Sequence, residues 1–237
     1  MLDAGCGTGN YMVEFIKSGK VARYTGIDLN EGMLNFARRK SNEINKDNGT
    51  TVTLLQGSLV DKLPFEDNTF DLVSNNQVLH HLTGKNGDMN VVSRVFAEFY
   101  RVLKPGGLVQ INLSTHMQME AFWVFKLLPD VLSRLLPILP DIEQYKGALG
   151  ETGFTAISTE TIYTSCVGDA SWDYERAFSE KWRNGMSMWT AATKEQTESA
   201  LEKLRSFLDD RDKFDKEMKA EIAKYGESTH IFARKCC

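Results

Sequence analysis

Short apolar segments recur along the chain, with amphipathic segments between them. The segments 24–28, 51–55 and 70–75 are rich in apolar and β-branched residues and have the length of strands. In the segment 30–37, apolar residues recur at the spacing of a helix. Further strands are predicted at 2–4, 108–113, 155–164 and 229–234, and further helices at 11–16 and 91–103. This alternation predicts an α/β protein of one domain built on a mostly parallel sheet.

A glycine-rich turn follows the first predicted strand. Gly5, Gly7 and Gly9 alternate there, and glycine permits a positive φ and leaves room for a ligand beside the main chain. The following helix begins with unpaired backbone N–H groups. Asp28 ends the second strand, where a carboxylate can accept hydrogen bonds from ribose hydroxyls. Together these features predict a site for a cofactor that contains adenosine.

Four stretches, in this order and at this spacing, resemble the class I S-adenosylmethionine-dependent methyltransferases, in particular the small-molecule branch typified by ubiquinone biosynthesis. They are residues 2–10, 27–28, 70–75 and 103–113. The resemblance implies a Rossmann-like, seven-stranded, mostly parallel sheet with an antiparallel last strand and helical insertions. It also implies S-adenosyl-L-methionine as cofactor. The implied cofactor-binding residues are Asp3, Gly5, Cys6, Gly7, Gly9, Asp28, Leu29, Ser58, Leu59, Asn75 and Asn76.

The chain departs from this family in two respects. Many relatives carry an aspartate at the position of Ser58, where it contacts the adenine amino group. Serine forms a weaker hydrogen bond, and Leu59 can cover the ring instead. The sequence begins inside the first strand, so the helices that cover the cofactor in the family are expected to be absent. Asp3 is expected near the cofactor's ammonium group, with capping of the loop as the alternative.

Three functions are compatible with these observations. The first is methyl transfer to a small, partly apolar molecule. The second is a methyltransferase fold that binds its ligand without turnover, as the serine and the missing cover suggest. The third is a nicotinamide-dependent oxidoreductase, which the spacing Gly-x-Gly-x-Gly disfavours because dinucleotide sites use Gly-x-Gly-x-x-Gly.

The composition limits which binding partners and which cellular compartment we expect for this protein. The net charge of −4 disfavours nucleic acid, which requires a basic face. Cys6, Cys166, Cys236 and Cys237 lack the spacing of a zinc site or a disulfide framework, so we expect no metal and a reducing compartment. No secretory leader is recognisable, so a cytoplasmic protein is expected.

Methyl transfer by in-line displacement depends mainly on alignment, and a base is needed only when the acceptor must lose a proton. His80, His81 and His116 are the candidate bases, because each lies at or just after the end of a strand. Packing roles are the alternative for all three. No third ligand is spaced to join the adjacent histidines at a metal.

Two helical segments, about 116–140 and 171–225, are expected to form lids on the domain. Charged residues and prolines interrupt the first, so it is no membrane span and we expect no stable membrane anchor. Its apolar side chains favour either core packing or contact with an apolar substrate. The candidate substrate-binding residues are Trp123, Trp182, Arg183 and Met186, the arginine having a surface ion pair as its alternative.

Overall fold

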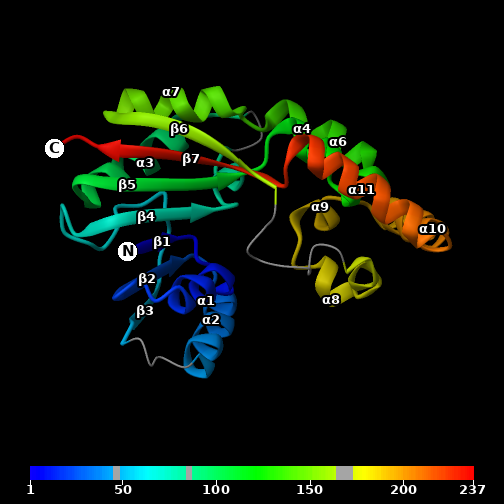
Figure 1. Cartoon of the computed structure of the whole chain (residues 1–237), viewed down its shortest axis with the longest axis horizontal. Helices are drawn as coiled ribbons and strands as arrows, with labels where there is room; N and C mark the ends of the chain where they lie inside the picture. Colours follow the sequence, from blue (N-terminus) through cyan, green and yellow to red (C-terminus); the bar gives the residue numbers. More distant parts are fainter. Residues whose placement is uncertain (45–48, 84–86, 164–172) are drawn as a thin grey trace. The chain divides into compact units, whose positions relative to one another are not determined.

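The structure is a computed structural model that describes residues 1–44, 49–83, 87–163 and 173–237 (Figure 1). Its strands are β1 (Leu2–Ala4), β2 (Arg23–Asp28), β3 (Thr51–Gln56), β4 (Phe70–Asn76), β5 (Leu103–Leu113), β6 (Phe154–Ile162) and β7 (Ser228–Lys235). Its α-helices are α1 (Asn10–Lys17), α2 (Glu31–Glu43), α3 (Asn90–Val102), α4 (His116–Ala121), α5 (Trp123–Leu127), α6 (Pro129–Leu135), α7 (Ile142–Thr152), α8 (Glu180–Arg183), α9 (Ser187–Thr190), α10 (Lys194–Leu208) and α11 (Arg211–Tyr225). Short 3-10 helices are η1 (Leu79–His81), η3 (Leu136–Ile138) and η5 (Tyr174–Phe178).

The strands form one seven-stranded sheet in the order β3-β2-β1-β4-β5-β7-β6. β1 pairs in parallel with both β2 and β4, and β7 runs against its neighbours (Figure 1). This confirms the predicted Rossmann-like sheet with an antiparallel last strand. The strand order reverses between β1 and β4, and open α/β sheets bind ligands beyond the carboxyl ends of the strands at such a point.

The chain divides into two compact units, which are described separately below. Unit 1 comprises residues 1–113, 140–160 and 230–237, and unit 2 comprises residues 114–139 and 161–229. The segments 116–140 and 171–225, expected from the sequence to be helical insertions, supply most of unit 2. Unit 1 holds nearly all of the sheet and the glycine-rich turn.

Unit 1 has apolar cores on both faces of its sheet. On one face, α3 and α7 pack against β1, β4 and β5. The apolar residues of α3 that recur every three or four positions are buried there: Val92, Val95, Phe96, Phe99 and Val102. The ring of Tyr100 on α3 extends this packing: it contacts the ring of Phe154 edge to face, with 5.0 Å between the ring centroids. On the other face, Met12 and Ile16 of α1 pack with Tyr24 of β2. The sheet is thereby covered by packed helices on both faces.

β5 begins earlier than predicted. The strand was predicted to begin at residue 108, after the proline and glycines of 105–107, which are typical of a turn. In the structure Leu103 already pairs with Phe70. Pairing resumes only at Leu108 with Leu72, so the intervening residues bulge out of the ladder. Gly106 has φ +75° within that bulge, a conformation that glycine adopts readily. The turn residues therefore interrupt a strand instead of preceding one.

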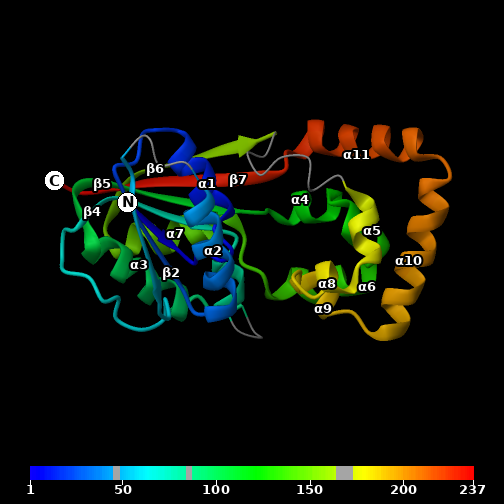
Figure 2. The same ribbon diagram turned by 90° about the horizontal axis from the view of Figure 1, so that it is seen from below.

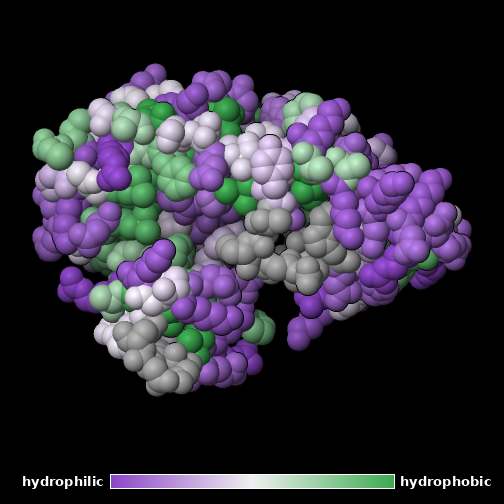
Figure 3. Space-filling model, in the orientation of Figure 1, coloured by the Kyte–Doolittle hydropathy of each residue, from purple (hydrophilic) through white to green (hydrophobic). Residues whose placement is uncertain are grey.

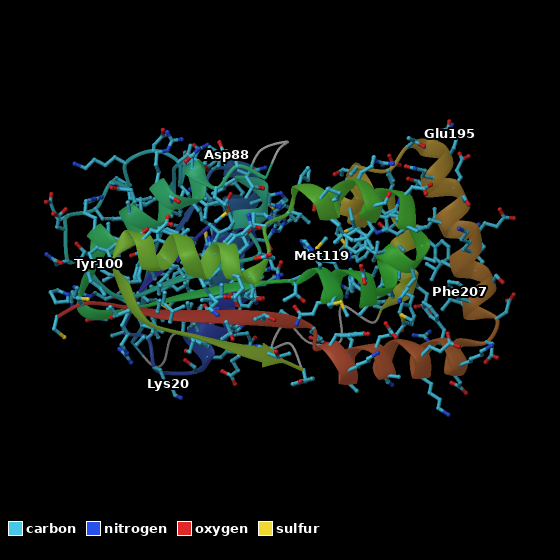
Figure 4. All side chains as sticks on the ribbon, turned by 90° about the horizontal axis from the view of Figure 1, so that it is seen from above. Lys20, Asp88, Tyr100, Met119, Glu195 and Phe207 are labelled. Carbon is cyan, nitrogen blue, oxygen red and sulfur yellow. The ribbon has the colours of Figure 1, made fainter. Side chains whose placement is uncertain are left out.

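Unit 2 is helical and has an aromatic core. Trp123, Tyr174 and Phe214 are each at most 4% exposed and lie in the same buried cluster. Met119 on α4 packs against this cluster, and Phe207 on α10, 38% exposed, stacks on Phe214 (Figure 4). None of the helices in the described residues is long and apolar enough to cross a bilayer.

The longest helices of unit 2 are separately capped. Thr193 and Gln196 form a capping box at the start of α10, and Asp210 accepts a hydrogen bond from Lys213 N at the start of α11. The two helices meet at a corner (Figure 2). Their outer surface is hydrophilic (Figure 3), which agrees with the narrow apolar stripe of each helix.

Candidate cofactor site

The turn after β1 has the backbone that its glycines predict. Gly5, Gly7 and Gly9 have φ of +83°, +52° and +75°. A Cβ on Gly5 would lie 2.5 Å from a methyl carbon of Val78, whereas one on Gly7 would meet no atom within 4 Å. Gly5 is therefore required for packing. Gly7 leaves the outer side of the turn open, as a ligand lying against the backbone needs.

The carboxylate of Asp28 joins the turn to the second strand. Its Oδ2 accepts a hydrogen bond from Gly7 N at 2.8 Å, and its Oδ1 accepts one from Asn30 N at 2.8 Å. Asn30 in turn caps α2 by accepting from Met33 N at 3.1 Å. Each carboxylate oxygen has a further lone pair, so Asp28 can hold the turn and still accept hydrogen bonds from two hydroxyls.

Asp3 lies under the turn, 1% exposed. Its Oδ2 accepts a hydrogen bond from the Tyr24 hydroxyl at 2.5 Å, and its Oδ1 has no hydrogen-bond partner among the described residues. Burial raises the pKa of Asp3 to about 6, although the hydrogen bonds from Tyr24 and Asn76 act in the opposite direction. A buried carboxylate oxygen without a partner is the type of group that an ammonium ion satisfies.

The residues expected around adenine lie where β2 and β3 end. Leu29 is 69% exposed and Leu59 is 7% exposed. The hydroxyl of Ser58 accepts a hydrogen bond from Val60 N at 3.3 Å. Cys6 is buried, and burial raises the pKa of its thiol well above the usual range, so it is an inert packing group below Gly26.

Polar side chains on β4 and β5 continue the site. Asn76 Nδ2 donates to Ser74 Oγ at 2.9 Å, and Ser74 Oγ donates to Gln110 Oε1 at 2.5 Å. Asn75 points to the opposite face, where its Nδ2 donates to Ala4 O at 2.7 Å. Its Oδ1 is buried and has no hydrogen-bond partner among the described residues. Asn75 thus supports β1 beneath the turn.

A further cluster of polar side chains, at the carboxyl ends of β4 and β5, was not predicted from the sequence. Gln77 follows β4 with φ +56°, a conformation that costs a residue with a side chain about 1–3 kcal/mol. Its N donates to Asn112 O at 2.8 Å, and its Nε2 donates to Asn112 Oδ1 at 3.2 Å. Asn112 Nδ2 donates to the hydroxyl of Tyr11 at 2.9 Å. The alternation of Gln110 and Asn112 within an apolar strand was the signal that could have revealed this group.

The three candidate bases have different surroundings. His80 and His81 lie in η1 with ring centroids 3.9 Å apart. Burial, together with His81, lowers the pKa of His80 to about 3, and burial also lowers the pKa of His81. His80 is consequently a weak base near neutral pH. His116 is the first residue of α4 in unit 2, and its Nε2 hydrogen bonds with Leu139 O at 2.9 Å.

The four candidate substrate residues all lie in unit 2. Trp123 is 2% exposed and stacks on Trp182 at 6.4 Å between ring centroids. Arg183 Nη1 donates to Ala177 O at 2.5 Å, and its guanidinium lies over the ring of Trp189 at 6.0 Å. Met186, the N-cap residue of α9, packs against the same aromatic cluster. These contacts place Trp123 in the core of unit 2 and give Arg183 local partners.

The described residues contain no group of three potential metal ligands.

Comparison with known proteins finds a methyltransferase domain in this chain. Residues 2–111 match the family model described as a methyltransferase domain. The chain is 28% identical over 196 residues to the protein named "Probable methyltransferase ltbC" of Aspergillus luteorubrus, covering 76% of this chain and 67% of that protein. It is 35% identical over 143 residues to a demethylmenaquinone methyltransferase of Staphylococcus aureus, covering 56% and 53%.

The fold agrees with these matches. A phosphoethanolamine N-methyltransferase 2 of Haemonchus contortus, solved with S-adenosyl-L-methionine, superimposes with a TM-score of 0.57 and 22% identity over 100% of this chain and 48% of that one. The chain therefore spans about half the length of several proteins that it matches. Residues 2–111 thus match a methyltransferase domain, and the fold is that of the S-adenosylmethionine-dependent methyltransferases to which the chain is similar.

Proposed function

We propose that this protein transfers a methyl group from S-adenosylmethionine to a small, partly apolar molecule. The observation that carries the proposal is the carboxylate of Asp28, which bridges Gly7 N and Asn30 N beside the open side of the turn. The donor set fits the cofactor, because hydroxyls, an ammonium group and an adenine ring require acceptors and apolar cover. Asp28, the buried oxygen of Asp3 and the side chains of Leu29 and Leu59 supply them.

S-adenosylmethionine supplies, when bound, a methyl group activated on a positively charged sulfur. Asp28 would hold the ribose, and Asp3 would face the ammonium group. The remaining task of the protein is to align the acceptor and exclude water, which can contribute roughly 7–11 kcal/mol. An acceptor that loses a proton on methylation can release it to solvent or to His81, which is more exposed than His80.

We also propose a class of methyl acceptor, on the basis of one relative's name. A demethylmenaquinone methyltransferase is named for a quinone-type molecule, and this chain shares 35% identity with one over 143 residues. An aromatic ring that carries oxygen is therefore the first acceptor to test. A screen of such rings with radiolabelled methyl donor, followed by product analysis, distinguishes methyl transfer from binding without turnover.

The donor site is tested by calorimetry with S-adenosylhomocysteine. Asp28→Ala should weaken binding by about tenfold or more, because each hydrogen bond to a charged group contributes about 1.5–3 kcal/mol. Glu66→Ala, at an exposed residue of unit 1, is the matched control and should bind as the wild type does. Equal affinity in both variants would refute the assignment, and binding of NADH in preference to S-adenosylhomocysteine would favour an oxidoreductase.

A further inference from the structure

The carboxyl group of Asp3 is buried beneath the cofactor turn, and the protein pairs only part of it. Asp3 lies on β1, between β2 and β4 and two residues before Gly5, and it is 1% exposed. Its Oδ2 accepts a hydrogen bond from the Tyr24 hydroxyl at 2.5 Å. Its Oδ1 is buried and has no hydrogen-bond partner among the described residues. One oxygen is therefore satisfied by the fold and the other is not.

The groups around Asp3 do not compensate a negative charge. β2 contributes the phenol of Tyr24 and the carboxylate of Asp28, and the turn contributes the thiol of Cys6. β4 contributes the uncharged amide of Asn76, and the buried residues of α1 are apolar. Of the charged groups in the described residues that act on Asp3, none is a cation, and Asp28 is of like charge. Burying a carboxylate without a cation is unfavourable, so this environment favours the neutral acid.

The neighbouring phenol and thiol keep their protons where Asp3 changes its charge. Burial raises the pKa of Tyr24 and the pKa of Cys6 above their usual ranges, whereas the pKa of Asp3 is about 6. Of these three groups, Asp3 alone therefore gains or loses a proton between pH 5 and 7.

An ammonium group next to Oδ1 would reverse the preference for the neutral acid. It supplies a hydrogen-bond donor to the unpaired oxygen and the positive charge that the surroundings lack, and both favour the ionised carboxylate. An α-amino group stays mostly protonated below about pH 7. The ligand therefore carries its positive charge under conditions in which Asp3 is still neutral.

We propose that Asp3 releases a proton to solvent when the ammonium group of the cofactor binds, so that the affinity for the cofactor depends on the charge of this buried acid. The proposal rests on the function proposed above and adds a control by pH to the same site. In this step the O–H bond of the neutral acid breaks and its electron pair stays on the carboxylate. The proton passes to water, and an N–H of the ammonium group donates a hydrogen bond to Oδ1. No bond of the cofactor is broken.

The direction of the pH dependence follows from the pKa of Asp3. It is about 6 in the protein without ligand, and the ammonium group lowers it in the complex. Below this value the acid must lose its proton before it can pair, so the affinity should fall by about tenfold between pH 7 and pH 5. Above this value the carboxylate is already ionised, and its charge no longer changes on binding.

Calorimetry with S-adenosylhomocysteine counts the released proton. Phosphate and Bis-Tris buffers take up a proton with different enthalpies, so the heats of binding measured in the two buffers at pH 6 give the number released. We expect about 0.5 proton for each molecule bound, because Asp3 is half protonated at this pH. Methylthioadenosine shares the adenosine and the thioether but lacks the ammonium group, and it should bind without releasing a proton.

Asp3→Asn has a similar shape but no proton to lose. This variant should bind S-adenosylhomocysteine without proton release, and its affinity should not change between pH 5 and pH 7. Glu66→Gln removes a carboxylate from an exposed residue of unit 1, and as the matched control it should release as much as the wild type. The comparison with methylthioadenosine uses the wild-type protein, so it holds whether or not Asp3→Asn folds.

Three results would overturn the proposal. They are binding of S-adenosylhomocysteine without proton release, equal release with methylthioadenosine, and unchanged release in Asp3→Asn. Each of them leaves the proposed methyltransferase function in place, because S-adenosylhomocysteine still binds. Failure of the wild-type protein to bind S-adenosylhomocysteine would instead refute that function, and with it this proposal.

Discussion

Unit 1 and unit 2 differ in where they bury polar side chains and in how far aromatic side chains fill their cores. Unit 1 buries Asp3, Asn75 and Asn112, all near the carboxyl ends of the parallel strands. Unit 2 buries mainly aromatic and aliphatic side chains, and arginines such as Arg205 and Arg211 lie over aromatic rings. Burying a polar group is unfavourable unless it is hydrogen-bonded, so its presence in a core needs a reason. In unit 1 these buried polar groups lie at the proposed cofactor site, and in unit 2 the core holds the helices together.

The comparison changes the expectation for Trp123. From the sequence, Trp123 was a candidate substrate residue in a segment for which core packing was the alternative. In the structure it has a core environment, 2% exposed and in edge contact with Tyr174 at 5.1 Å between ring centroids. Trp182, its stacking partner, is only partly buried. A substrate role is therefore easier to reconcile with Trp182 than with Trp123.

The largest expected effect is that of Trp123→Ala. Removing this side chain should lower the free energy of unfolding of unit 2 by about 3–5 kcal/mol, because a buried cavity replaces an indole. Urea denaturation followed by limited proteolysis measures the loss and locates it. Affinity for S-adenosylhomocysteine should persist where unit 1 remains folded. If Trp123→Ala left the stability of unit 2 unchanged but raised the KM for the acceptor, the result would support a substrate-binding role for Trp123.

Asp3→Asn should remove a pH dependence from unit 1. The pKa of Asp3 rises from 3.8 to about 6 on folding, so the folded state binds the proton more tightly. The stability that this group contributes is present below pH 3.8 and is lost as the pH rises through about 6. The stability of the variant relative to the wild type should therefore increase by about 2.4 kcal/mol between pH 4 and 7, as measured by denaturant unfolding at each pH. A constant difference across this range would contradict the prediction.

The two glycines of the turn should respond differently to alanine. Gly5→Ala adds a Cβ 2.5 Å from Val78 at φ +83°, and it should lower the free energy of unfolding by about 2–3 kcal/mol. Gly7→Ala meets no atom, so only the backbone conformation is penalised, by about 1–2 kcal/mol. Thermal unfolding compares the stabilities, and calorimetry should show that Gly7→Ala still weakens binding of S-adenosylhomocysteine. Equal stability in the two variants would be inconsistent with the packing of Val78.

Thr193→Ala should have the smallest effect. It removes the side-chain cap of α10 and should destabilise unit 2 by about 1 kcal/mol. Hydrogen exchange at the first turn of α10 measures the change, and Thr190→Ala, on an exposed helix end of the same unit, is the control. Affinity for S-adenosylhomocysteine should not change. A loss of donor affinity would show that the two units do not have separate roles.

The sequence determined the sheet, the turn and the acid at the end of β2. These features depend on local rules: apolar periodicity sets the strands and helices, and glycine permits the backbone of residues 5–9. The wrong prediction for the start of β5 also has a local cause. Proline and glycine, which occur at residues 105–107, are typical both of a bulge within a strand and of a turn before one.

Only the tertiary structure decided which polar groups meet. Tyr11, Gln77 and Asn112 are far apart in the sequence, and their hydrogen bonds depend on β4 lying between β1 and β5. The core role of Trp123 likewise depends on Tyr174, 51 positions away, because burial is a property of packed elements and not of a residue type. Local periodicity specifies each element, whereas the chemistry of the site arises where separate elements come into contact.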